Sequence, residues 1–256
     1  MYKLILLDLD GTLLRSDKTI SDYTLSVLNF CRKKNIKIAV STARGESNAK
    51  SFLSALKPDI IVSSSGALVK YGNKVIYSSS FSETETRTII NKSFEIEKDC
   101  EITVDTVDKH YWNYKTDPHI QSPDWGDVEF TDYNHFKEKA LKICVELKSE
   151  VSADLISQSV QNCDYARFSD GNWYKFTKSN ATKSEALDTV LDVLGITYSD
   201  VVSFGDDYVD IEMLRLCKKG IAVENAIDEV KSVADEIIES NDNDGVAKWL
   251  EKNILI

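Results

Sequence analysis

An alternation of apolar strand-like runs with helical patterns opens this sequence, stops, and later returns. The runs KLILLDL, IKIAVST and DIIVSS are nearly all apolar, and helical patterns at 21–33 and 46–56 separate them. Strands that are apolar on both faces and are joined by helices are typical of a parallel sheet covered on both sides. A hairpin-like stretch, ALVKYGNKVIYSS, follows the third run. The alternation resumes at Lys183, with the runs DVVSFGD, KGIAVEN and EIIES between short helical segments.

The middle of the chain has a different character. SETE at 82–85 has capping-box spacing and predicts a helix to about Lys98. Strand-like stretches follow at 101–106 and 110–114, and we expect a helix at 134–149. The stretch DYARFSDGNWYKFTK predicts a hairpin that turns at Asp170-Gly171-Asn172.

These two patterns together predict the fold class and the domain organisation. We expect an α/β protein with a doubly wound parallel-sheet core formed by residues 1–80 and 180–256. The mixture of helices and hairpins at 81–179 predicts an inserted α+β domain.

Composition restricts the partners and the location of the protein. The formal net charge of -11 would repel nucleic acid. Five widely spaced cysteines fit neither a disulfide framework nor a CxxC metal site, and they indicate reduced thiols in a cytoplasmic protein. No stretch approaches the roughly 18 apolar residues that span a membrane. We expect a cytoplasmic protein, a monomer or weak homo-oligomer, with no membrane or nucleic-acid partner.

Polar side chains follow the predicted strands, at the edge of a parallel sheet where ligands bind. The residues at these strand ends are Asp8, Asp10, Ser41, Thr42, Arg44, Ser64, Ser65, Gly66, Asp206, Asp207, Asp210, Glu224 and Asn225. Carboxylates gathered on one rim would repel each other, and hard oxygen ligands suit Mg²⁺. Hydroxyl groups, free backbone amides and a lysine would then suit the oxygens of a phosphate. The rim predicts a metal-assisted phosphoryl-transfer site.

Four motifs now carry a resemblance to a known family. The motifs DLDGT, STAR, KSEAL and GDDYVD resemble those of the haloacid dehalogenase superfamily of aspartate-nucleophile phosphatases. The tail GIAVENAIDEVKSVADEIIESNDNDGVAKWL is similar to that of the Cof-type branch, whose members carry a large α/β cap after the third strand. The resemblance covers residues 1–80 and about 177–256, and the middle segment resembles a cap only in size, position and mixed character.

The resemblance implies roles for several side chains. Asp8 would be the nucleophile that forms an aspartyl-phosphate, and Asp10 the general acid and then the general base. Thr42 would donate a hydrogen bond to the phosphoryl group. Lys183 would neutralise the nucleophile and the phosphate.

The resemblance also implies a Mg²⁺ site and a set of binding residues. Asp8, the backbone carbonyl of Asp10 and Asp206 would hold the ion, with Asp210 supporting its waters or Lys183. The remaining candidates for binding substrate or phosphate are Gly11, Ser41, Arg44, Ser65, Gly66 and Asn225.

Three positions depart from the family pattern. Ala43 stands where Gly is usual, Ser65 where Asn is common, and Val209 where Asn is usual. Several candidates also have plain structural interpretations. Thr42 and Asn225 could cap helices, Lys183 could lie on a helix surface, and the aromatic residues of the middle segment could be packing rather than a substrate platform.

The sequence therefore predicts a Mg²⁺-dependent phosphatase of small phosphorylated metabolites, such as sugar phosphates or related monoesters. A phosphomutase of the same superfamily would use the same residues. The three departures motivate a different alternative, a phosphometabolite-binding or regulatory protein without turnover. A phospho-accepting receiver domain would leave the inserted segment and Asp10-Gly11-Thr12 unexplained.

Overall fold

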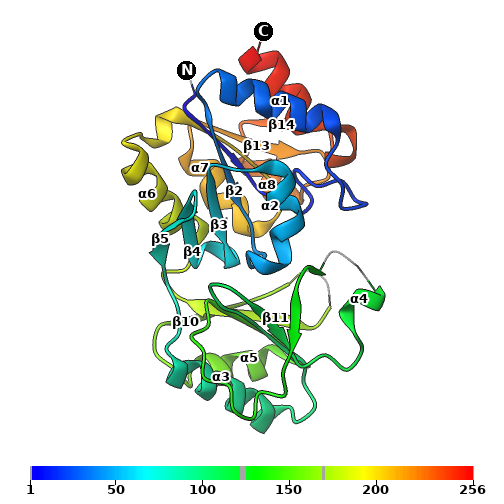
Figure 1. The fold of residues 1–256 in the computed structure, drawn as a ribbon, viewed down its shortest axis with the longest axis vertical. Coiled ribbons are helices and arrows are strands. Elements are labelled where there is room, and N and C mark those ends of the chain that lie inside the picture. The colour runs from blue at the N-terminus through cyan, green and yellow to red at the C-terminus, as the bar shows by residue number, and fades with distance from the viewer. Residues whose placement is uncertain (1, 122–124, 169–170, 256) are drawn as a thin grey trace. The chain divides into compact units, whose positions relative to one another are not determined.

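A computed structural model describes residues 2–121, 125–168 and 171–255 of the 256-residue chain (Figure 1). These residues form two compact units. The core unit comprises Met1–Ala43, Phe52–Tyr77 and Lys183–Ile256, and the inserted unit comprises Arg44–Ser51 and Ser78–Thr182. The segment Arg44–Ser51, which sequence analysis placed in the core, thus packs with the inserted unit.

The core unit is built on an eight-stranded sheet with the order β14-β13-β12-β1-β2-β3-β4-β5. The six strands from β14 to β3 pair in parallel, and β4 pairs antiparallel with β3. The strands are β1 (Leu4–Leu7), β2 (Lys37–Ser41), β3 (Ile60–Ser63), β4 (Leu68–Tyr71), β5 (Lys74–Ser78), β12 (Val201–Gly205), β13 (Lys219–Val223) and β14 (Glu236–Ile238). All four residues of β1 are buried, as expected for a central strand covered on both faces.

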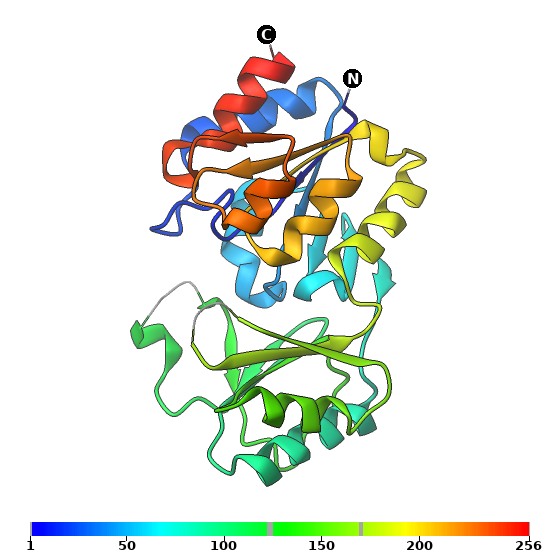
Figure 2. The same ribbon diagram turned by 180° about the vertical axis from the view of Figure 1, so that it is seen from behind.

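Helices cover both faces of this sheet (Figures 1 and 2). They are α1 (Asp22–Lys33), α2 (Lys50–Leu56), α6 (Lys183–Leu194), α7 (Ile211–Leu216), α8 (Asp228–Val233) and α9 (Gly245–Leu250). Leu4 and Leu6 of β1 share one hydrophobic cluster with α6 and α7. α1 packs against α9, beside the C-terminus. The predicted α/β fold class is confirmed.

The inserted unit contains a six-stranded sheet with the order β10-β11-β9-β6-β7-β8. Its strands are β6 (Ile102–Asp105), β7 (His110–Trp112), β8 (Val128–Phe130), β9 (Lys142–Glu146), β10 (Cys163–Arg167) and β11 (Trp173–Lys178). Its helices are α3 (Glu83–Ile96), α4 (Pro118–Gln121) and α5 (Glu150–Ser157). α3 begins at the predicted capping box, in which Ser82 and Glu85 bond reciprocally.

One predicted helix is wrong and one predicted hairpin is correct. Residues 134–149 do not form a helix, because Lys142–Glu146 is strand β9, paired between β6 and β11. Its side chains alternate between the two faces of the sheet, and Ile143 and Val145 belong to the hydrophobic cluster of this unit. The hairpin of β10 and β11 forms as predicted, although Asp170 of its turn lies outside the described residues.

Among the described residues, no helix is both long enough and apolar enough to cross a bilayer.

Candidate active site

The candidate site lies in the core unit, where the order of the strands reverses around β1. The chain runs from β1 to β2 and β3 on one side, and β12 to β14 lie on the other side. Asp8 follows β1 directly, and Asp206 follows the neighbouring strand β12. Ligands of open α/β sheets bind at such a switch point, outside the carboxyl ends of the strands. The fold therefore brings these two carboxylates to the edge where a ligand is expected.

A buried lysine joins two of the predicted carboxylates. Lys183 Nζ lies 2.6 Å from Asp8 Oδ1 and 2.7 Å from Asp210 Oδ1. The exposed fractions of the three side chains are 3%, 9% and 0% respectively. Lys183 begins α6, so the helix places the ammonium group under the end of β1. The interpretation of Lys183 as a helix-surface lysine is wrong.

Asp210 also organises the loop after β12. Its Oδ2 accepts hydrogen bonds from the backbone N–H groups of Asp206, at 3.0 Å, and Asp207, at 3.2 Å. Gly205 allows this close approach, because a Cβ there would lie 2.5 Å from Asp210 Cβ. The loop is thus held by one carboxylate that also contacts Lys183.

Asp206 is held by two residues of the DLDGT motif. Thr12 Oγ1 donates a 2.6 Å hydrogen bond to Asp206 Oδ1. Gly11 has a φ of +81°, and a Cβ on it would lie 2.2 Å from Asp206 Oδ2. Glycine is therefore required here both by the backbone conformation and by the approach of a carboxylate.

We predict that Gly11→Ala lowers catalytic efficiency by at least about 100-fold, because the new Cβ pushes Asp206 out of place. Gly195→Ala is the matched control: Gly195 also has a positive φ, of +62°, but nothing lies within 4 Å of its added Cβ. The measurement is kcat/KM of both variants for one phosphate monoester, the substrate class that the resemblance implies. Equal losses in the two variants would show that backbone strain, and not Asp206, is responsible.

The electrostatics of this site reflect an excess of negative charge. Burial raises the pKa of Asp8 well above its usual range; Lys183 opposes this shift, and Asp210 and Asp206 add to it. Burial likewise raises the pKa of Asp206 from its usual value of 3.8 to about 7. Burial alone would lower the pKa of Lys183, but Asp210 and Asp8 raise it. Three carboxylates thus surround a single ammonium group.

The side chains present fit a divalent cation. Oxygen atoms of Asp8, Asp206 and Asp210 lie within 4.8 Å of one another. Three carboxylates and one ammonium group carry a formal charge of −2, which Mg²⁺ would balance. Hard carboxylate oxygens at a partly open edge are the donor set that Mg²⁺ prefers. Three of the four predicted acidic residues therefore have clustered carboxylates in an arrangement suited to this ion, whereas the Asp10 carboxylate pairs with Lys18.

We predict that the metal-free protein loses stability as the pH rises from about 5.5 to 8. The folded state holds a proton on Asp206, with a pKa of about 7, which the unfolded chain has already released. Stability therefore falls as the pH rises to the folded pKa, and Asp206 contributes at most about 2 kcal/mol to the fall between pH 5.5 and 8. Guanidinium unfolding in EDTA and in Mg²⁺ measures this effect, and Mg²⁺ should reduce the fall. A rise in stability across this range in EDTA would contradict it.

The loops after β2 and β3 hold the other predicted phosphate-binding residues. Thr42 is buried, and its carbonyl accepts a 3.2 Å hydrogen bond from the Ser65 N–H. Ser64, Ser65 and Gly66 follow one another with positive φ values of 50°, 62° and 100°. Such strain in non-glycine residues gathers at functional sites. The buried Ser41 Oγ has no hydrogen-bond partner.

The remaining predicted residues, Asp10, Asn225 and Arg44, make contacts outside the carboxylate cluster. Asp10 forms a 2.8 Å ion pair with Lys18, a residue that sequence analysis missed. Asn225 donates to the Gly11 carbonyl at 2.7 Å and accepts from the Asn241 N–H at 3.0 Å, so it joins two loops of the core. Arg44 belongs to the inserted unit, where it contacts the Asn48 carbonyl.

Comparison with known proteins decides the family. A family model described as haloacid dehalogenase-like hydrolase matches residues 5–250. The chain belongs to this family. The resemblance stated from the sequence motifs is thereby confirmed, and the match includes the inserted unit.

Curated relatives of this hydrolase are named as phosphatases. Two of them, YitU and YcsE of Bacillus subtilis, are each named 5-amino-6-(5-phospho-D-ribitylamino)uracil phosphatase. YitU is 26% identical over 97% of this chain and 96% of its own length. YcsE is 26% identical over 99% of this chain and 96% of its own length.

Solved structures share the fold of this hydrolase. A haloacid dehalogenase-like hydrolase from Bacteroides thetaiotaomicron superimposes with a TM-score of 0.86 at 22% identity, covering 98% of this chain and 99% of that one. The subclass IIB sugar phosphatase BT4131 superimposes with a TM-score of 0.83 at 22% identity, covering 99% of this chain and 100% of that one. These likenesses show a shared fold over 98% and 99% of this chain.

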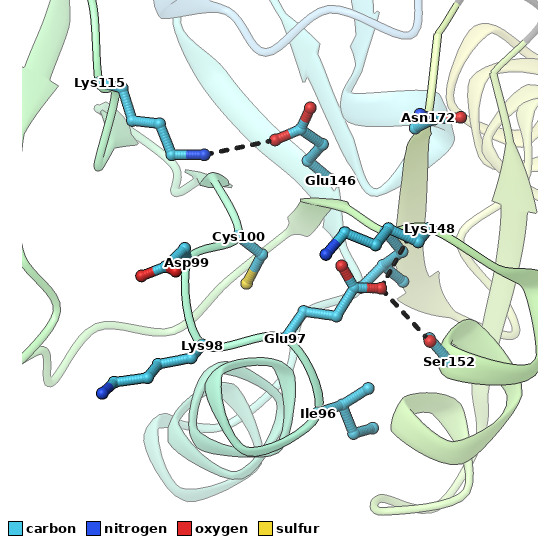
Figure 3. Close-up of a pocket in the computed structure, with 11 residues that line it drawn as sticks. Ile96, Glu97, Lys98, Asp99, Cys100, Lys115, Glu146, Lys148, Ser152 and Asn172 are labelled. Carbon is cyan, nitrogen blue, oxygen red and sulfur yellow. Dashed lines mark hydrogen bonds and ion pairs between the residues drawn. The ribbon is translucent and has the colours of Figure 1, made fainter.

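The inserted unit of this hydrolase also contains a pocket of about 670 Å³ (Figure 3). In the pocket wall, Lys115 pairs with Glu146, at 3.8 Å. Glu97 accepts hydrogen bonds from the Lys148 N–H, at 2.7 Å, and from Ser152 Oγ, at 3.4 Å, and so fastens the start of α5. The lysines and the acidic residues of the wall balance in charge. These contacts within the wall stabilise the unit, so they account for its charged residues without a ligand.

The aromatic residues of the inserted unit mainly pack against each other. Trp112 is 9% exposed and forms edge-on contacts with Tyr114, Trp125 and Trp173. Its ring centroid lies 5.3 Å from that of Trp125 and 5.8 Å from that of Trp173. Tyr111 is equally buried, in the hydrophobic cluster of the unit. The packing interpretation of these residues accounts for the contacts observed.

Proposed function

We propose that this chain is a Mg²⁺-dependent phosphatase that hydrolyses small phosphorylated metabolites through an aspartyl-phosphate at Asp8. The observation that carries the proposal is the buried contact of Lys183 with both Asp8 and Asp210, beside Asp206 at the switch point of the sheet. A carboxylate fixed by an ammonium group at a ligand-binding edge is placed as a nucleophile. The relatives named as phosphatases support hydrolysis of phosphate monoesters by this enzyme.

The first half of the reaction transfers the phosphoryl group to the protein. A carboxylate oxygen of Asp8 forms a bond to phosphorus while the bond from phosphorus to the ester oxygen breaks. Asp10 gives its proton to the departing alkoxide. Thr42 donates to a phosphoryl oxygen, and Lys183 offsets the negative charge that gathers there.

The second half returns Asp8 to its starting state. Asp10, now a carboxylate, takes a proton from a water molecule that attacks phosphorus. The bond between phosphorus and Asp8 breaks, and inorganic phosphate leaves. Asp8, Asp206 and the Asp10 carbonyl, with Asp210 in support, would hold Mg²⁺, which would neutralise charge on the phosphoryl oxygens.

We assign the choice of substrate to the inserted unit, which serves as a cap that excludes water from the reaction. Sugar phosphates and related monoesters are the proposed substrates, and the uracil-containing ester named for two relatives belongs in the same panel. The five free cysteines support a reducing, cytoplasmic location. The net charge of -11 supports an enzyme without a nucleic-acid partner.

Release of inorganic phosphate from a panel of such esters tests this function. We expect release in Mg²⁺ and its loss in EDTA. Formation of an isomeric phosphate ester without release would instead identify a phosphomutase. Binding of esters without either reaction would identify a regulatory protein.

A further inference from the structure

A row of three charged or polar side chains crosses the sheet of the inserted unit. Lys142 of β9, Asp105 of β6 and His110 of β7 lie opposite one another in the strand register. His110 Nδ1 lies 2.5 Å from Asp105 Oδ1, and Lys142 Nζ lies 3.0 Å from Asp105 Oδ2. Their side chains are at most 7% exposed.

The row lies on the face of the sheet opposite the hydrophobic cluster. Ile102, Val104, Tyr111 and Ile143, which alternate with the row along β6, β7 and β9, belong to that cluster. Side chains alternate between the faces of a strand, so the row lies on the opposite face. Three ionisable or polar side chains buried there have no part in the core of the unit.

The segment Arg44–Ser51 packs against this row. A Cβ on Gly45 would lie 2.7 Å from Asp105 Cγ, and Ser47 Oγ donates a 2.8 Å hydrogen bond to the Asp108 carbonyl in the turn between β6 and β7. On the other side of the segment, a Cβ on Gly126 would lie 2.8 Å from the Cα atom of Asn48. Asn48 is thereby fixed in the same corner of the unit as the row.

Two buried polar atoms of this corner lack hydrogen-bond partners. They are His110 Nε2 and Asn48 Oδ1, in residues that are 2% and 4% exposed. Buried polar groups are almost always satisfied, so each unpaired atom calls for a partner outside the protein.

The tautomer of His110 decides what that partner is. Lys142 already balances the charge of Asp105, whose other oxygen faces Nδ1. We therefore assign the tautomer in which Nδ1 donates its hydrogen to Asp105, which leaves Nε2 as an acceptor. Asn48 Oδ1 is an acceptor as well, so both atoms require donors such as hydroxyl groups.

We propose that His110 and Asn48 accept hydrogen bonds from hydroxyl groups in the alcohol part of the substrate. The hydrolase then selects polyhydroxylated phosphate esters over esters of plain alkyl alcohols, and this inference rests on the proposed function. A site built around substrate hydroxyl groups rejects analogues without them, because its buried acceptors stay unpaired.

The test compares kcat/KM for sorbitol 6-phosphate and hexyl phosphate, which have the same number of carbon atoms. We expect the wild-type protein to prefer the sorbitol ester by at least about 10-fold. His110→Asn can keep the contact with Asp105 through its amide but has no atom at the Nε2 position. In this variant kcat/KM for the sorbitol ester should fall by about five- to 50-fold, and kcat/KM for hexyl phosphate should not change.

Three further variants make the result specific. His110→Gln places an amide near the Nε2 position and should stay within about threefold of the wild-type preference. Asn48→Leu should lose part of the preference, and His135→Asn, at an exposed position of the same unit, should leave it unchanged. Thermal unfolding of each variant checks that it is folded.

Two results would overturn the inference. One is a wild-type protein with no preference for the sorbitol ester. The other is an equal loss of kcat/KM for both esters in His110→Asn, with no recovery in His110→Gln. That result would mean that the cluster binds only internal water. The proposed function fails only if no ester of the panel releases phosphate. If the sorbitol and hexyl esters are not hydrolysed, the ratio of their calorimetric Kd values in the same variants decides this inference separately.

Discussion

Asp8→Asn is expected to abolish phosphate release, by at least about 10⁴-fold in kcat, while the protein remains folded. The amide cannot form the aspartyl-phosphate, so the residual rate reflects binding and orientation alone. Lys183 keeps its 2.7 Å contact with Asp210 in this variant, so no charge is left unpaired in the core. Steady-state phosphate release in Mg²⁺, with circular dichroism as the check on folding, makes the measurement.

Asp207→Asn is a suitable control for this variant. Asp207 lies in the same acidic loop, but its side chain bonds the Tyr208 N–H at 2.8 Å and is not among the three clustered carboxylates. We expect its activity to stay within about 10-fold of wild type. If Asp8→Asn retained activity like that of Asp207→Asn, Asp8 would not be the nucleophile.

Lys183→Met is expected to have the largest effect on stability. Loss of the ammonium group leaves Asp8 and Asp210 buried without their cation, and breaking a buried ion pair costs about 3–5 kcal/mol. Guanidinium unfolding in EDTA at pH 8 measures the loss. Mg²⁺ should recover part of it, because the ion can neutralise the same carboxylates.

Lys37→Met is the matched control, since Lys37 pairs with Asp59 at 2.8 Å but is 42% exposed. An exposed pair of this kind contributes at most about 1 kcal/mol. We also expect kcat of Lys183→Met to fall by about 100-fold or more. A metal-free stability within about 1 kcal/mol of wild type would contradict the role given to Lys183.

The sequence was sufficient to predict the family and the core fold, because both depend on local patterns. Apolar runs on β1 and β12 fix a buried parallel sheet, and each acidic motif follows its strand directly. The spacing of DLDGT and GDDYVD therefore predicted which edge would carry Asp8, Asp206 and Asp210. Thr12, which holds Asp206, could have been found in the same motif, since its hydroxyl stands two residues after Asp10.

The features that escaped prediction depend on contacts between distant segments. The row of Lys142, Asp105 and His110 forms only because β9 pairs with β6, and β9 was predicted as part of a helix. Its pattern KICVE is short, and short apolar runs fit either period. The packing of Arg44–Ser51 with the inserted unit, and the contact of Lys18 with Asp10, likewise left no local signal in the sequence.

The central claim is that Asp8 carries the phosphoryl group during turnover. The most direct test is mass spectrometry of peptides from enzyme quenched in acid during turnover of a phosphate ester with Mg²⁺. We expect the mass of one phosphoryl group on the peptide that contains Asp8, and none in EDTA or in Asp8→Asn. Turnover without a phosphorylated peptide, or with the phosphoryl group on another residue, would contradict the account.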